Sequence, residues 1–128
     1  MSFSHVHTQN IEAGGASISG GGTYSGSSQV RVSETVVTGS TDFEIVVGLD
    51  VSAVKSIVIK SDKAVTLETN SGSAADDTIA LKANVPYVWN TDSYDAFLLG
   101  TDVTSIFITN ASGSTATITI DAIVDATP

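Results

Sequence analysis

Two histidines near the start of the chain are the residues best suited to metal chemistry. His5 and His7 form a His-x-His pair. On a β-strand a spacing of two places both imidazoles on one face, where they could share a metal ion, and in a trimer such pairs could meet on an axis. We favour a simpler interpretation, in which both are polar residues of a terminal segment whose docking contacts are Phe3 and Val6. We therefore assign no metal and no cofactor.

Acidic residues gather in segments that we expect to be loops, where β-sandwiches often bind Ca²⁺. They are Asp50, Asp76, Asp77, Asp92, Asp95 and Asp102. No stretch matches the dense Asp-x-Asp-x-Asp-Gly pattern of a calcium loop. We interpret most of these carboxylates as turn residues that accept hydrogen bonds from their own backbone.

The sequence offers little for catalysis. A Ser-His-Asp arrangement requires a histidine in the folded domain, whereas both histidines lie in the N-terminal segment. The number of acidic residues leaves a paired-carboxylate mechanism open, but nothing marks two of them as facing each other across a cleft. We expect no enzymatic activity and assign no catalytic residue.

Aromatic residues are concentrated in residues 84–100, which hold the single tryptophan and two of the three tyrosines. Aromatic side chains beside Asn and Asp can form sugar-stacking surfaces or protein interfaces. For Trp89 we favour a structural role, in which it closes one end of the domain with Phe97 and Leu98. Tyr87 and Tyr94 are expected to face a partner.

From Gln29 onward, β-branched residues recur at every second position, which is typical of half-buried strands. Turn residues separate the apolar runs. We predict about eight strands, near residues 29–37, 41–48, 54–61, 64–69, 77–82, 86–90, 104–110 and 115–124. The alternation excludes a parallel sheet buried on both faces. The pattern predicts an all-β fold, a single antiparallel β-sandwich of jelly-roll or Greek-key type.

The first 28 residues differ from the rest, because they hold six of the eleven glycines. A segment so rich in Gly and Ser buries too little apolar surface to offset its loss of entropy on ordering. We therefore divide the chain into an extended, flexible N-terminal arm, residues 1–28, and a β-sandwich domain, residues 29–128. The residues of the arm expected to bind a partner are Phe3, His5, Val6, His7, Ile11, Ile18 and Tyr24.

The net charge of −9 argues against binding to nucleic acid and to anionic membranes, because the five basic residues are scattered. The absence of cysteine excludes disulfides and thiolate sites. The N-terminus lacks the basic and apolar regions of a secretory signal, so we expect synthesis in the cytoplasm.

Three stretches carry a resemblance to a known class of proteins. They are Val54-Lys-Ser-Ile-Val-Ile-Lys-Ser-Asp62 with Ala64-Val-Thr-Leu-Glu-Thr-Asn70, Ile79-Ala-Leu-Lys-Ala-Asn-Val-Pro-Tyr-Val-Trp89, and Val103-Thr-Ser-Ile-Phe-Ile-Thr-Asn-Ala-Ser-Gly113 running to Thr127-Pro128. This layout, preceded by a Gly/Ser-rich arm, resembles that of head decoration (cement) proteins and minor virion structural proteins of tailed bacteriophages.

The resemblance implies a structural subunit on the capsid surface of a virion, made in the host cytoplasm. Its partner would be the major capsid protein of a phage shell, and decoration proteins of this class are commonly homotrimers whose N-terminal arms reach neighbouring capsid proteins. The resemblance supplies no catalytic residues. Two alternatives remain: a carbohydrate-binding or adhesin-like module, with Tyr87, Trp89 and Tyr94 as the stacking platform, and a component of a tail or baseplate.

Overall fold

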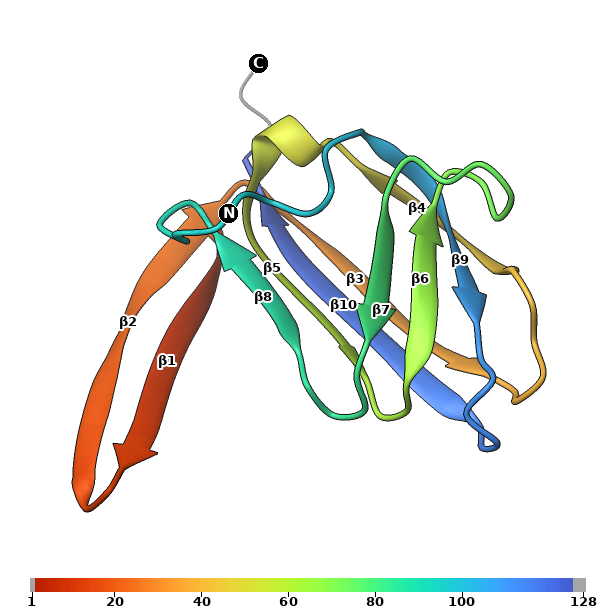
Figure 1. Cartoon of the computed structure of the whole chain (residues 1–128). Helices are drawn as coiled ribbons and strands as arrows, with labels where there is room; N and C mark the ends of the chain where they lie inside the picture. The colour runs from red at the N-terminus through yellow and green to blue at the C-terminus, as the bar shows by residue number, and fades with distance from the viewer. Residues whose placement is uncertain (1, 126–128) are drawn as a thin grey trace.

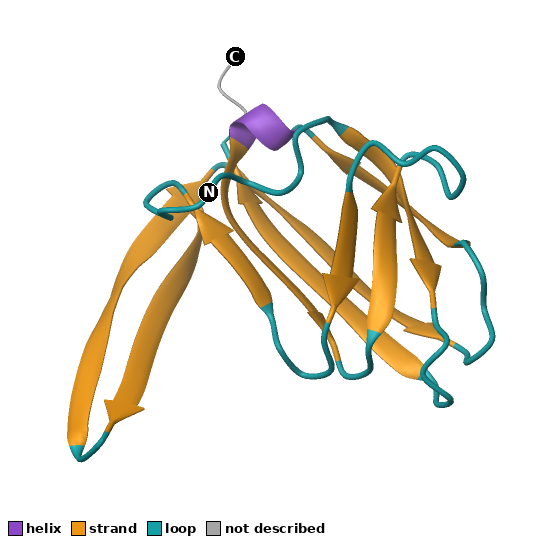
Figure 2. Cartoon of the chain, in the orientation of Figure 1, coloured by secondary structure: helices purple, strands orange, loops and turns teal. Residues whose placement is uncertain are grey.

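The computed structural model describes residues 2–125, and β-strands make up nearly all of its regular structure (Figure 2). The strands are β1 (Phe3–Ala13), β2 (Ala16–Gly26), β3 (Ser28–Val36), β4 (Phe43–Leu49), β5 (Val54–Ser61), β6 (Val65–Thr69), β7 (Thr78–Leu81), β8 (Tyr87–Asn90), β9 (Val103–Thr109) and β10 (Ala116–Val124). One short 3₁₀ helix, Val51–Ala53, precedes β5. The expectation of an all-β protein is confirmed.

Eight of these strands form two antiparallel four-stranded sheets (Figure 1). Sheet I has the order β3-β10-β5-β8, and sheet II has the order β4-β9-β6-β7. The chain passes from one sheet to the other at most connections. The arrangement is compatible with a β-sandwich, and the eight strands predicted from the period-two pattern correspond to β3–β10.

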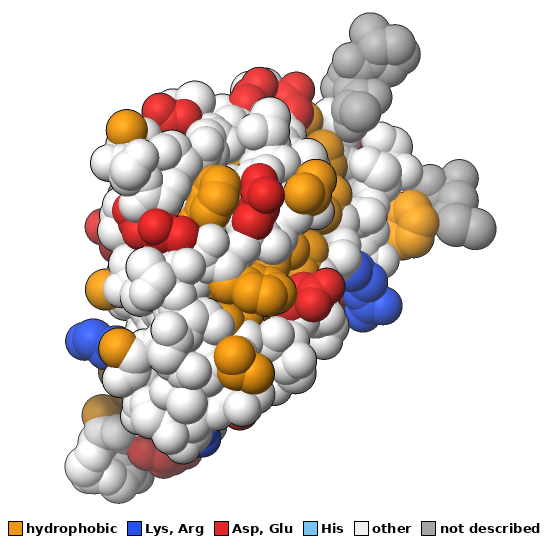
Figure 3. All heavy atoms as spheres, turned by 90° about the vertical axis from the view of Figure 1, so that its right-hand side faces the viewer, with side chains coloured by type: hydrophobic (Ala, Val, Ile, Leu, Met, Phe, Trp, Pro, Cys, Tyr) orange, Lys and Arg blue, Asp and Glu red, His pale blue; other side chains and the backbone are white. Residues whose placement is uncertain are grey.

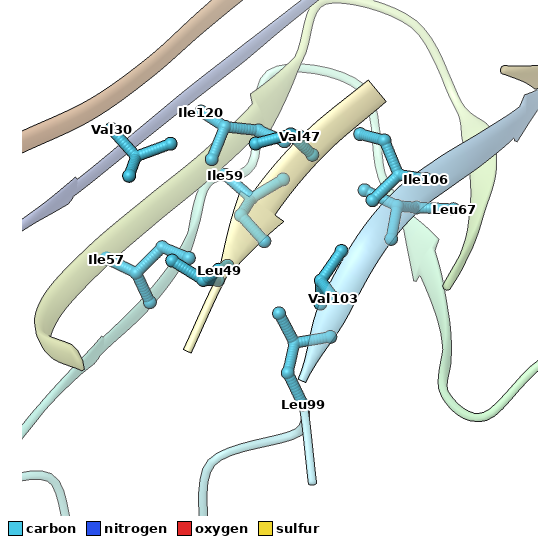
Figure 4. Close-up of a pocket in the computed structure, with 10 residues that line it drawn as sticks. All are labelled: Val30, Val47, Leu49, Ile57, Ile59, Leu67, Leu99, Val103, Ile106 and Ile120. Atoms are coloured by element: carbon cyan, nitrogen blue, oxygen red, sulfur yellow. The ribbon is translucent and has the colours of Figure 1, made fainter. Parts of the chain in front are cut away.

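The core lies between the two sheets and is built from alternate residues of each strand. Ile57 and Ile59 of sheet I and Leu67 and Ile108 of sheet II are at most 1% exposed. Figure 4 shows side chains of both sheets around a small apolar cavity of about 20 Å³. A cavity of this size has room for about one water molecule, and its lining offers a water no polar partner.

The N-terminal segment differs from the flexible arm expected from its composition, because it forms a β-hairpin. β1 and β2 pair along their whole length, from Phe3 opposite Gly26 to Ala13 opposite Ala16. The turn consists of Gly14 and Gly15, with φ angles of 59° and 91°. Two consecutive positive φ angles define the type I′ turn that closes two-residue hairpins, and glycine adopts them without strain. Glycines interpreted as a source of flexibility thus form the turn that orders the segment.

The hairpin extends away from the two sheets (Figure 1). Its residues 8–21 are all exposed, whereas its base lies against sheet I. Gly26 packs so closely on β10 that a Cβ atom there would lie 2.5 Å from the carbonyl oxygen of Val124. The hairpin is therefore anchored at one end and unsupported at the other.

Candidate functional site at the base of the hairpin

Polar side chains on the outer face of sheet I form the surface to which the hairpin is attached. Ser56 of β5 and Asp121 of β10 alternate with core residues, so their side chains point away from the core. Asn90 of β8 lies opposite Ser56 in the ladder, and Arg31 of β3 lies opposite Asp121. Adjacent strands therefore present these groups side by side.

His5 joins the hairpin to the last strand. Its Nε2 atom lies 2.7 Å from Oδ1 of Asp121, and its Nδ1 atom lies 2.7 Å from Oγ of Ser56. Asp121 also accepts hydrogen bonds from Nε2 of Gln29 at 2.8 Å and from Nε of Arg31 at 2.7 Å. The Asp121 carboxylate thus accepts hydrogen bonds from three donors, one on β1 and two on β3.

His7 occupies the next position along the same face of the hairpin. Its Nε2 atom lies 2.5 Å from Oγ of Ser56, and its Nδ1 atom lies 3.3 Å from Nδ2 of Asn90. The ring of Tyr24 meets that of His7 edge-on, with centroids 5.1 Å apart. The hydroxyl group of Tyr24 donates to Asp92 at 3.0 Å. Both strands of the hairpin therefore contribute to its attachment.

These contacts define the direction of every hydrogen bond when both histidines are neutral. A carboxylate only accepts, so His5 carries its proton on Nε2, and its Nδ1 atom accepts from the Ser56 hydroxyl group. The Ser56 oxygen then accepts from Nε2 of His7, and Nδ1 of His7 accepts from the amide of Asn90. The result is a chain of donors running from Asn90 to Asp121 in which every buried polar atom is satisfied.

The pKa values of His7 and Asp121 are both shifted. Burial, and secondarily the neighbouring His5, lower the pKa of His7. Burial opposes the charged form of Asp121, but the hydrogen bonds from Gln29, Arg31 and His5 together outweigh it and lower the pKa of that carboxyl group. The lowered pKa values favour a neutral His7 and an ionised Asp121, which are the protonation states that the hydrogen-bond chain requires.

The cluster contains a Ser–His–Asp sequence of contacts, which corrects the expectation that the histidines stay apart from the folded domain. Ser56 has no exposed surface, so a substrate cannot reach its hydroxyl group. The geometry is that of a structural connection between the hairpin and sheet I.

The His-x-His pair makes protein contacts with all of its ring nitrogens. Each of the four nitrogens of His5 and His7 has a hydrogen-bond partner within the chain. Within residues 2–125, no group of three or more His, Cys, Asp or Glu residues has the geometry of a metal site. The expected role of Asp50 is confirmed, since its side chain accepts from the backbone amide of Ser52.

The residues predicted to bind a partner fall into two groups in the hairpin. Phe3, His5, His7 and Tyr24 are half-buried, and the last three contact the protein's own sandwich. The second group points into solvent, with exposed fractions of 72% for Val6, 55% for Ile11 and 65% for Ile18. Ile11 and Ile18 lie opposite each other near the turn.

The predicted aromatic residues of the sandwich do not form one platform. Tyr87 packs against the core, and its hydroxyl oxygen accepts from the backbone amide of Leu98. Trp89 is half-buried and stacks on Phe97 with centroids 4.5 Å apart, as its expected structural role requires. Tyr94 is fully exposed and stands apart from that stack.

Sequence reasoning missed Ser56, Asn90 and Asp121 as partners of the hairpin. Each is a polar residue at an outward position of a strand, which is its ordinary environment. No local motif connects them with histidines that lie 49 to 116 positions away. Only the folded arrangement reveals their association.

Comparison with protein-family profiles, with curated proteins and with solved structures found no match to this chain. Among residues 2–125, the structure contains no helix that is long and apolar enough to cross a membrane.

Proposed function

We propose that this protein is a structural subunit of a virion, a decoration (cement) protein that binds the outer surface of a phage head and stabilises it. One observation carries the proposal: a hairpin fixed at its base to the sandwich holds an unpartnered apolar pair, Ile11 and Ile18, away from the body of the protein. The partners in this proposal are the major capsid protein and further copies of the chain in a homotrimer.

The hairpin has the properties of a binding element. A two-stranded ribbon is only marginally stable by itself, and its distal half makes no contact with the sheets. Burial of one isoleucine side chain against a partner contributes about 1.5–3 kcal/mol. The anchored base limits the entropy lost on binding, because the hairpin is already ordered before it meets its partner.

The strand order is consistent with the same proposal. We infer a jelly-roll type for the sandwich, because sheets ordered β3-β10-β5-β8 and β4-β9-β6-β7 correspond to two Greek keys folded over each other. Jelly rolls occur in viral capsid domains and also in lectins. The fold is therefore consistent both with a virion subunit and with a carbohydrate-binding module, and the two differ in the surface that they require.

The surface favours a protein partner. On the side of the molecule shown in Figure 3, hydrophobic side chains lie in the open with acidic side chains around them. The carbohydrate-binding alternative needs Tyr87, Trp89 and Tyr94 on one open surface, whereas Tyr87 and Trp89 are half-buried against the core and Trp89 is stacked on Phe97. A tail or baseplate protein would use the same hairpin to bind its partner. It would differ from a head protein only in the particle that it binds.

Binding to purified particles tests the proposal. Heads and tails of the phage that encodes the chain, stripped of this protein, are incubated with it, and bound copies are counted by quantitative gel densitometry. We expect saturable occupancy on heads and a loss of at least about tenfold in affinity for Ile11→Ser combined with Ile18→Ser. Asn10→Ser, on the opposite face of the same hairpin, is the control.

Each result has a defined consequence. Absence of binding to either particle overturns the virion proposal, and binding to tails alone moves the protein to the tail. Equal occupancy of the double variant and the control contradicts the role of the apolar pair.

A further inference from the structure

We propose that the hairpin tip, residues 9–20, packs on the outer face of sheet I in a second copy of this chain, against Val58 and Val88. The inference rests on the homo-oligomer contained in the proposed function and names the surface that forms it.

The face of the tip that would bind is continuous with the face already bound to sheet I. Cross-strand pairs along this face are His5 with Tyr24, His7 with Gly22, Gln9 with Gly20 and Ile11 with Ile18. Alternation puts all four pairs on the same side of the ribbon. The first two contact the protein's own sheet I or the loop that follows it, and the last is apolar and exposed.

The hairpin crosses sheet I toward its edge and continues past it. Its contacts begin at Asp121 on β10, continue at Ser56 on β5 and reach Asn90 on β8, which is the edge strand. Tyr24 then contacts Asp92, in the loop that follows β8. Residues 8–21, beyond these contacts, are exposed and extend away from the sheets (Figure 1). The tip can therefore cover only a surface placed beside β8.

A second copy offers a matching surface. Val58 and Val88 lie opposite each other on the outer face of sheet I, in the row next to Ser56 and Asn90. Val88 is 43% exposed. The hairpin of the same chain covers the row of Ser56 and Asn90 and leaves Val88 open. In two neighbouring copies, the exposed pair Ile11 and Ile18 of one hairpin would therefore pack on the pair Val58 and Val88 of the other copy's sheet I.

The distribution of charge favours a contact between the hairpin tip of one copy and sheet I of another, although the two copies have the same overall negative charge. Each chain has a net charge of −9, but Glu12 is the only Asp, Glu, Lys or Arg among residues 1–30. On the outer face of sheet I, Arg31 is paired with Asp121, and Lys60 of β5 remains as an exposed basic residue, unmatched among residues 2–125. An almost neutral tip with one carboxylate would therefore meet the face that has a basic excess.

Engineered cysteines test the contact without interference, because the natural chain contains no cysteine. Ile18→Cys is prepared with one affinity tag and Val88→Cys with another, and the two full-length proteins are mixed and oxidised under mild conditions. We expect a disulfide-linked product carrying both tags, at least about tenfold more abundant than with Asn10→Cys, on the opposite face of the tip, in place of Ile18→Cys, since a held pair has a high effective concentration.

Light scattering on the natural protein and the particle-binding assay separate the possible failures. A monomer in solution and on the particle overturns the inference together with the homo-oligomer. An oligomer without the mixed disulfide overturns only the inference, because another surface then joins the copies. If the mixed disulfide is absent while Ile11→Ser with Ile18→Ser abolishes particle binding, the tip binds the shell protein instead, which overturns the inference and leaves the proposed function intact.

Discussion

His5 and Asp121 lie 116 positions apart in the sequence, yet their side chains meet at 2.7 Å. This contact joins the first strand of the chain to the last. Because Asp121 is held in place by Gln29 and Arg31 on the neighbouring strand, the histidine binds to an acceptor that is already oriented. The hairpin is thereby an attached part of the sandwich and not a free tail.

Replacing Asp121 by Asn is expected to loosen the hairpin. The amide has one acceptor oxygen for three donors, and its NH₂ group faces other donors, so we expect a loss of about 1–3 kcal/mol in the free energy of unfolding. Urea denaturation measures the loss, and hydrogen exchange of β1 amides shows where it acts. Glu34→Gln removes an exposed carboxylate from β3 and should change neither quantity. Unaltered exchange in β1 for Asp121→Asn would contradict the anchoring role.

Acidification is expected to weaken the attachment in two stages. The pKa of His7 is lowered from 6.5 in the folded protein, so the stability it contributes is complete above pH 6.5 and is lost as the pH falls through its folded pKa. The pKa of Asp121 is lowered from 3.8, so a second loss follows below that pH. Urea midpoints between pH 8 and pH 3 measure both stages, and His7→Gln should abolish only the first. A midpoint that is constant from pH 8 to pH 5 would be inconsistent with this account.

The hydrogen-bond chain predicts the tautomer of each histidine. Both rings should carry their proton on Nε2 at neutral pH, because His5 donates to a carboxylate and His7 donates to Ser56. Long-range ¹H–¹⁵N spectra of the imidazole rings distinguish the two tautomers. Ser56→Ala removes the acceptor of His7 Nε2 and should release the His7 ring to a mixture of tautomers, whereas His5 should stay protonated on Nε2 because it still donates to Asp121. Ser33→Ala on exposed β3 should change neither ring. An Nδ1-protonated His7 in the natural protein would refute the proposed direction of the chain.

The glycine turn predicts a clear difference between two substitutions. Gly15→Ala places a Cβ atom at a φ of 91° and should destabilise the hairpin by about 1 kcal/mol. Gly14→Asn has a φ of 59°, which Asn tolerates, and should leave the hairpin intact. The cross-strand nuclear Overhauser effect between Ile11 and Ile18 reports on the pairing. Equal signals for both variants would show that the turn does not control the ribbon.

Asn110 is expected to be important for the stability of the sandwich. It is fully buried, and its amide donates to the carbonyl oxygens of Val36 and Ser114 at 2.8 and 2.9 Å. Asn110→Ala leaves these acceptors unsatisfied and should cost about 1–3 kcal/mol. Thermal unfolding measures the loss, with exposed Asn10→Ala as the control. A melting temperature equal to that of the control variant would disprove this role.

The sequence was sufficient to predict the all-β fold and its eight core strands but not the site. β-branched residues at every second position identify strands such as Val54–Ser61 because alternation is a local property. The hairpin was not predicted because its Gly/Ser-rich composition is typical of a flexible segment. The Gly-Gly turn between Ile11 and Ile18, which indicates a hairpin, was given less weight. The cluster was missed because Ser56 and Asp121 look like ordinary outward residues, and the contact with His5 depends on long-range folding.

The position of β10 has a consequence for how the protein is made. β10 lies between β3 and β5 and carries the acceptor for His5, so sheet I and the hairpin attachment both wait for residues 116–124 to leave the ribosome. Contacts of such long sequence separation form slowly. A chain that ends before residue 116 therefore carries all four strands of sheet II but has neither a continuous sheet I nor an anchored hairpin.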